Sequence, residues 1–153
     1  MKATFDINLT SRKTLELYLN THTLSQLNTI PEGFSNNLIW NIGHIVVVQQ
    51  LLVHHLSGLP MYVSDELVAK YRKGTKPEHT VTQEEVDEIK SLLFTTVEQT
   101  QHDFQNNRFQ EYTEFTTMTG YHITNAKDAM EFNNYHEAIH TGIIMQIQKF
   151  LLH

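Results

Sequence analysis

The stretch NAKDAMEFNNYHEAIHTGIIMQIQKF (125–150) decides the fold class of this 153-residue chain. Its apolar residues and histidines recur every three or four positions, which is the period of one face of an α-helix. The stripe consists of Ala129, Phe132, His136, His140, Ile143, Ile147 and Phe150. We therefore expect a long helix that starts near Asn125, runs almost to the end of the chain and packs this stripe into a core.

Three segments upstream show the same helical period. The first spans about Leu9 to Thr29. The second runs from a candidate N-cap at Ser35 to about Ser57, where Gly58 and Pro60 are stop signals. The third opens with TQEE (82–85), a pattern typical of a capping box. The three prolines of the chain lie between these segments, as expected because proline breaks helix interiors.

The links between the four segments differ in length. The first link is short, which suggests that the first two helices are antiparallel neighbours. The 58–81 link has room for a short helix around Asp65 to Arg72, and the 108–124 link alternates apolar and polar residues like an extended segment. We find no repeat or interdomain linker, so we expect residues 1–153 to form one domain. The predicted fold class is all-α, a four-helix bundle with long connections.

The composition argues against several functions. The formal net charge is −6 and the 11 Lys and Arg are spread without a basic run, so neither nucleic acid nor an anionic membrane surface is an expected partner. The chain has no cysteine, which excludes disulfides, thiolate metal ligands and a thiol nucleophile on the protein. We see no signal-peptide core and no apolar run of membrane-spanning length, and therefore expect a cytoplasmic protein.

The last predicted helix contains the motif H-E-x-x-H, formed by His136, Glu137 and His140. Histidines at i and i+4 lie on the same helical face, and here that face is the apolar one. His44, in the W-x-x-x-H pattern that starts at Trp40, can point into the same core from a facing helix. Three such imidazoles would leave one position of a tetrahedral metal open. The alternative is that all three are core histidines that hydrogen-bond to Ser, Thr or backbone groups.

The other seven histidines show no comparable spacing. They are His22, His54, His55, His79, His102, His122 and His153. We interpret them as surface or partly buried polar residues. Two of them, His22 and His55, lie on apolar stripes and are candidates for core histidines with satisfied hydrogen bonds.

H-E-x-x-H is also the signature of zinc peptidases, but the rest of the chain disfavours that function. The metzincin pattern requires a further histidine downstream, and no glutamate follows Glu137 that could replace it. The terminal His153 is a poor ligand candidate. Glu137 lies about 100° around the helix from His136, so it is a weak candidate for a catalytic base. We favour a solvated helix residue or a hydrogen-bonding partner of a ligand.

The chain resembles the DinB/YfiT family in three stretches, PEGFSNNLIWNIGH (31–44), KGTKP (73–77) and HEAIHTG (136–142). The element order and spacing agree over nearly the whole chain. The resemblance implies a four-helix bundle, often a homodimer, with zinc or nickel held by His44 and the two histidines of the last stretch. Some relatives are S-transferases that use thiols such as bacillithiol or mycothiol, one branch isomerises maleylpyruvate, and many have no known reaction.

Together with the histidine pattern, this resemblance implies a divalent-metal-dependent enzyme, and we expect an S-transferase that joins a low-molecular-weight thiol to an electrophilic small molecule. A cation held by neutral ligands would stabilise the thiolate, which is the nucleophilic form of a thiol. Trp40 is a candidate for the pocket lining, with core packing as its simpler role. A non-catalytic metal-binding bundle and a hydrolase that uses metal-bound hydroxide are the alternatives.

Overall fold

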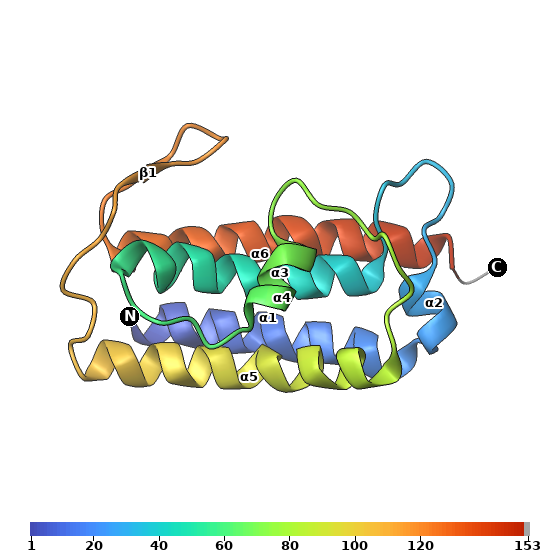
Figure 1. The fold of residues 1–153 in the computed structure, drawn as a ribbon, viewed down its shortest axis with the longest axis horizontal. Helices are drawn as coiled ribbons and strands as arrows, with labels where there is room; N and C mark the ends of the chain where they lie inside the picture. The colour runs from blue at the N-terminus through green and yellow to red at the C-terminus, as the bar shows by residue number, and fades with distance from the viewer. Residues whose placement is uncertain (152–153) are drawn as a thin grey trace.

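Figure 1 shows the computed structural model of the protein, which describes residues 1–151. Four long helices lie side by side as a bundle, which confirms the predicted all-α fold. The elements are α1 (Lys2–Thr21), α2 (Leu24–Asn28), α3 (Leu38–Val53), the 3₁₀ turn η1 (His55–Ser57), α4 (Asp65–Tyr71), α5 (Gln83–Gln105), β1 (Phe115–Thr116), β2 (His122–Ile123) and α6 (Ala126–Lys149). None of the described helices is long and apolar enough to cross a membrane.

The four long helices are arranged so that the first two are diagonal rather than adjacent. In Figure 1, α1 and α6 run in one direction, and α3 and α5 run in the other. Helix α3 packs on α5 and α6, and α1 packs on the same two helices from the opposite side. The expectation that the first two long helices are neighbours is therefore wrong, although they are antiparallel. Helix α2 and the loop after it carry the chain across the end of the bundle.

Side-chain caps define the starts of three of the long helices, α3, α5 and α6. Thr82, the first residue of the predicted capping box, caps α5, and Asn125, the predicted start of the last helix, caps α6. Each side chain accepts a hydrogen bond from a backbone N–H of the first turn. The cap of α3 is Asn37 and not Ser35, because the Asn37 side chain accepts the bond from the Trp40 N–H at 2.9 Å. The helix consequently starts later than expected.

The first helix differs most from its expected bounds. It begins at Lys2 rather than near Leu9, and it ends at Thr21. The residues expected to continue it form the separate helix α2, which starts at a capping box made by Thr23. Because α1 begins early, Asn8 lies in its middle and is buried against the bundle.

The two long links contain the elements expected of them. The first contains α4, which packs against α3. The second contains a hairpin in which β1 and β2 pair antiparallel, with Phe115 opposite Ile123. This hairpin extends away from one end of the bundle in Figure 1. With α4 on its outer side, α3 is buried over 14 of its 16 residues, which makes it the central helix of the fold.

Candidate metal centre

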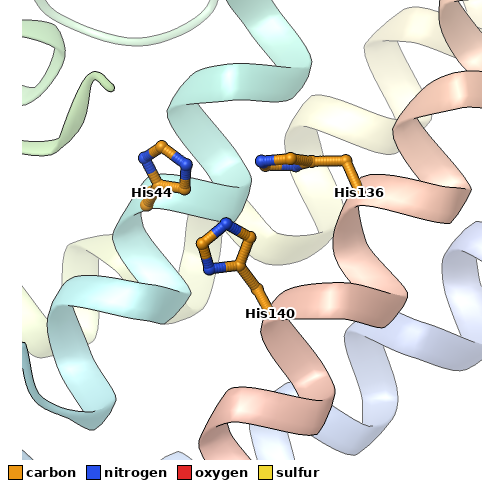
Figure 2. Close-up of side chains that lie close together, drawn as sticks. All are labelled: His44, His136 and His140. Atoms are coloured by element: carbon orange, nitrogen blue, oxygen red, sulfur yellow. The ribbon is translucent and has the colours of Figure 1, made fainter. Parts of the chain in front are cut away.

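His44 on α3 faces His136 and His140 on α6, and the three rings point toward one another in Figure 2. One ring nitrogen of each histidine lies within 4.8 Å of those of the other two. The ring centroids are 4.5 to 5.2 Å apart. The structure therefore brings together the three histidines selected from the sequence. It contains no other such cluster of potential metal ligands within residues 1–151.

Hydrogen bonds to oxygen atoms define the tautomers of two of these rings. His44 Nδ1 lies 2.6 Å from the Tyr71 carbonyl oxygen, and His140 Nδ1 lies 2.8 Å from Asn41 Oδ1. Both partners are acceptors, so each Nδ1 carries the proton and donates it. The Nε2 atom of each ring is left with a lone pair for the cluster, which is the usual arrangement of metal-binding histidines.

The partners of these rings are themselves held in place. Gly43 permits the close approach of Tyr71 to α3, because a Cβ atom at Gly43 would lie 2.6 Å from the tyrosine ring. The Tyr71 carbonyl can then reach His44. Asn41 is fully buried, and its Nδ2 donates to two acceptors before the start of α3. Its Oδ1 is thereby oriented toward His140.

Burial keeps the three imidazoles neutral at physiological pH. Burial lowers the pKa of His136 to about 3, with repulsion from the other two rings and from Arg12 adding to the effect. Burial and the nearby His44 lower the pKa of His140 to about 4. The pKa of His44 is also lowered by burial, although its bond to Tyr71 opposes the shift. Neutral imidazole is the form that binds a metal.

The donor set fits a divalent metal ion. Tetrahedral ligands at about 2.0–2.1 Å from zinc are roughly 3.4 Å from one another, so small ring rotations would close the present separation. His136 Nδ1 is buried without a hydrogen-bonding partner among the described residues, and the ring is therefore not satisfied by the protein alone. With no fourth protein ligand in the cluster, one coordination position would be left for a small molecule.

Glu137 does not point toward this cluster. Its side chain is fully buried and faces α1, where Arg12 Nη2 binds Oε1 at 2.8 Å. Asn8 and Asn133 each donate to the same oxygen at 2.8 Å. The interpretation of Glu137 as a solvated residue is therefore wrong, because the early start of α1 places polar side chains against it. Its oxygens are occupied by donors on a different side of α6 from His136.

Arg12 is one of the residues near this site that the sequence reasoning missed, together with Tyr71 and Asn41. It is fully buried, and its Nε also binds Glu137 Oε2 at 3.1 Å. A signal was present in the sequence, because Asn8, Arg12, Leu15 and Leu19 lie on one helical face. Two polar residues on an otherwise apolar stripe indicate a partner inside the core.

Trp40 packs against one of the clustered histidines, His44. Its indole stacks on His44 with ring centroids 4.7 Å apart and an interplanar angle of 14°. The indole Nε1 donates to Thr75 Oγ1 at 3.2 Å, which ties α3 to the link after α4. The W-x-x-x-H spacing thus places the tryptophan one turn before the histidine and against its ring.

The remaining histidines differ from expectation at two neighbouring positions, His54 and His55. His22 is buried, as its place on an apolar stripe indicated. His54 is fully buried with Nε2 3.3 Å from Asp103 Oδ2, whereas His55, the predicted core histidine, is exposed. Helix α3 ends just before these two residues, so the stripe cannot be extended through them. His153 lies outside the described residues.

A four-helix bundle with three inward-facing imidazoles on two facing helices has the architecture of a metal-binding bundle. Residues 9–144 match the DinB superfamily, and the chain belongs to that superfamily. A solved structure described as the conserved protein of a locus from Enterococcus faecalis is similar to it in fold, with a TM-score of 0.69 at 12% identity. That match covers 99% of this chain and 96% of the other. No curated protein matches the chain.

Proposed function

We propose that this protein is a divalent-metal-dependent S-transferase whose metal ligands are His44, His136 and His140. The observation that carries the proposal is the convergence of three neutral imidazoles without a fourth protein ligand. Zinc and nickel both suit such a donor set. When bound, the ion would lower the pKa of a thiol at its open position.

The thiol has to come from outside, because the chain contains no cysteine. The transfer joins the thiol sulfur to an electrophilic carbon, while the thiol proton passes to solvent and the leaving group departs with its bonding electrons. The protein's own contribution is positional. Tyr71 and Asn41 orient two of the imidazoles, and Trp40 shields one face of His44 from water.

A purely structural metal site is the first alternative. Structural zinc sites are usually closed by four protein ligands, and here the cluster has three. His136 and His140 also retain partial solvent exposure, as access for a small molecule requires. A metal-dependent hydrolase is the second alternative, and it would use the same three ligands without any thiol.

An activity screen separates these functions. The protein, loaded with zinc or nickel, is mixed with 1-chloro-2,4-dinitrobenzene and either cysteine, glutathione or bacillithiol, and the thioether product is followed by absorbance. We expect a rate that depends on both thiol and metal and is lost in His44→Ala. His55→Ala is the matched control, since it removes an exposed histidine outside the cluster. Hydrolysis of ester substrates without thiol would favour the hydrolase. Metal binding without either activity would favour the structural site.

We also propose that the protein forms a homodimer through the outer face of α6. Tyr135, Ile139 and Met145 on this helix are large apolar residues that are about half exposed. Clustered exposed apolar residues are typical of protein interfaces. Light scattering on the wild type and on Ile139→Glu tests the proposal: a dimer should become a monomer, and a monomeric wild type would contradict it.

A further inference from the structure

A cavity of about 750 Å³ lies between α3, α4, the start of α5 and the link that follows α4. Its volume is within the usual range for pockets that bind small molecules. Its walls include the aromatic residues Trp40 and Tyr71, while none of the three clustered histidines lines it. The cavity is therefore not lined by the candidate metal ligands.

The cavity lies beside the densest group of positive charge in the chain. Lys70, Arg72, Lys73 and Lys76 are four of the 11 Lys and Arg residues and fall within seven positions. The statement that the Lys and Arg residues are spread without a basic run therefore does not hold for this segment. A ligand at this cavity therefore meets positive charge along this segment, opposed on the wall by Glu78 and Glu85.

Lys70 and Lys76 line the cavity, and of these two only Lys70 forms ion pairs with described residues. Lys70 Nζ is 2.8 Å from Glu85 Oε2 and 3.2 Å from Glu66 Oε1. Lys76 forms no ion pair with any residue that the structure describes. Glu85, which also lines the cavity, is neutralised by Lys70 and accepts the Tyr71 hydroxyl. Glu78 places a negative charge on the same wall, so a cationic ligand is the alternative to an anionic one.

The apolar part of the wall suits a flat group. The indole of Trp40 and the phenol of Tyr71 are held rigidly, the first by Thr75 and the second by Glu85. Fixed aromatic rings favour planar apolar partners. The same two residues support His44, one by stacking and the other through its carbonyl oxygen.

We propose that this cavity binds a small aromatic carboxylate, with its ring against Trp40 and Tyr71 and its carboxylate at Lys76. The site does not depend on a bound metal. It is a second ligand site of the protein, which shares a wall with the residues that support His44.

The test uses the fact that Trp40 is the only tryptophan of the chain. Its indole N–H therefore gives one resonance in a ¹H–¹⁵N spectrum, and that N–H is at the cavity wall. Labelled protein is titrated in EDTA with three probes of similar shape: 2-naphthoate, the neutral 2-naphthamide and the cationic 2-naphthylmethylamine. We expect a saturable shift of the Trp40 resonance with naphthoate, and binding about twofold to fivefold weaker with the amide, as for an exposed charge pair.

Three variants locate the site. Lys76→Ala should weaken naphthoate binding to the level of the amide. Lys73→Ala, which removes the same charge from the same segment but not from the cavity wall, should leave it unchanged. Ala69→Phe fills the cavity from the exposed side of α4 and should abolish the shift. The proposal is overturned if the Trp40 resonance does not move, if the amide or amine binds as tightly as naphthoate, or if the two lysine variants behave alike.

Discussion

Arg12 and Glu137 form a fully buried ion pair, with Arg12 Nη2 2.8 Å from Glu137 Oε1, at the position next to His136 on α6. The pair joins α1 to α6, and Arg12 Nη1 also reaches the Leu93 carbonyl on α5 at 3.5 Å. Buried ion pairs add little net stability compared with apolar residues, but they favour one packing arrangement over others. Here the pair holds Glu137 against α1, while His136 and His140 face α3.

The first prediction concerns this ion pair. Arg12→Met leaves the Glu137 carboxylate buried without its cation, and we expect it to lower the free energy of unfolding by about 3–5 kcal/mol. The double variant Arg12→Met/Glu137→Met should recover most of that loss. Urea denaturation measures both, with Lys13→Met as the exposed neighbouring control. A double variant as unstable as the single one would contradict this account of the pair.

The second prediction compares two helical glycines. Gly43→Ala brings a Cβ atom to 2.6 Å from the Tyr71 ring, so α4 has to move and the Tyr71 carbonyl leaves His44. We expect a loss of about 1–3 kcal/mol of stability from overpacking and zinc affinity about tenfold lower. Gly142→Ala on α6 meets nothing within 4 Å and should stabilise the protein by roughly 0.5–1 kcal/mol. Equal effects of the two changes in denaturation and chelator competition would refute the role of Gly43.

The third prediction concerns Asn41. Asn41→Ala removes the acceptor that orients His140, and loss of such a partner typically lowers metal affinity about 10–100-fold. Zinc affinity is measured by competition with a chromophoric chelator. The control is Asn20→Ala, an exposed amide on α1 that bonds to Lys90 and lies outside the cluster. Unchanged zinc affinity in Asn41→Ala would rule out this orienting role.

The fourth prediction concerns the pH dependence of the metal-free protein. The folded state resists protonation of His136 and His140 until about pH 3 and 4, whereas unfolded histidine takes up its proton near pH 6.5. The unfolded state therefore binds more protons between these values, and the free energy of unfolding should fall as the pH drops from about 6.5 toward 4. Denaturation in EDTA should show a weaker dependence for His136→Phe/His140→Phe. If the free energy of unfolding of this variant depends on pH as that of the wild type does, groups other than His136 and His140 cause the effect.

The histidine trio was predictable because its members lie on apolar faces of long helices. The i, i+4 pair on α6 and the W-x-x-x-H pattern on α3 both place polar nitrogen in a core, and the packing of α3 on α6 then brings the rings together. The partners Tyr71 and Asn41 were not predictable. Tyr71 acts through its carbonyl oxygen, which carries no side-chain signal, and depends on the close approach permitted at Gly43.

The errors in the sequence reasoning have local causes. Periodicity does not show where a helix starts in a region of mixed polarity, so the start of α1 was predicted too late and Asn8 fell outside the expected helix. Arg12 lay inside it, but its place on the apolar stripe was overlooked. Its partner Glu137 was consequently interpreted as a solvated residue or a hydrogen-bonding partner of a metal ligand. A short link also does not show that the two helices it joins are neighbours. The link between α1 and α3 contains α2, which crosses the end of the bundle.

The most direct test of the central claim is the metal content of the protein purified without a histidine tag, for the wild type, His44→Ala and His55→Ala. We expect about one equivalent of zinc or nickel in the wild type and in His55→Ala, and a loss of the metal in His44→Ala, because three ligands hold the ion. The absence of metal from every protein after reconstitution with zinc and nickel would contradict the claim. So would full retention of the metal in His44→Ala, which would place the third ligand elsewhere.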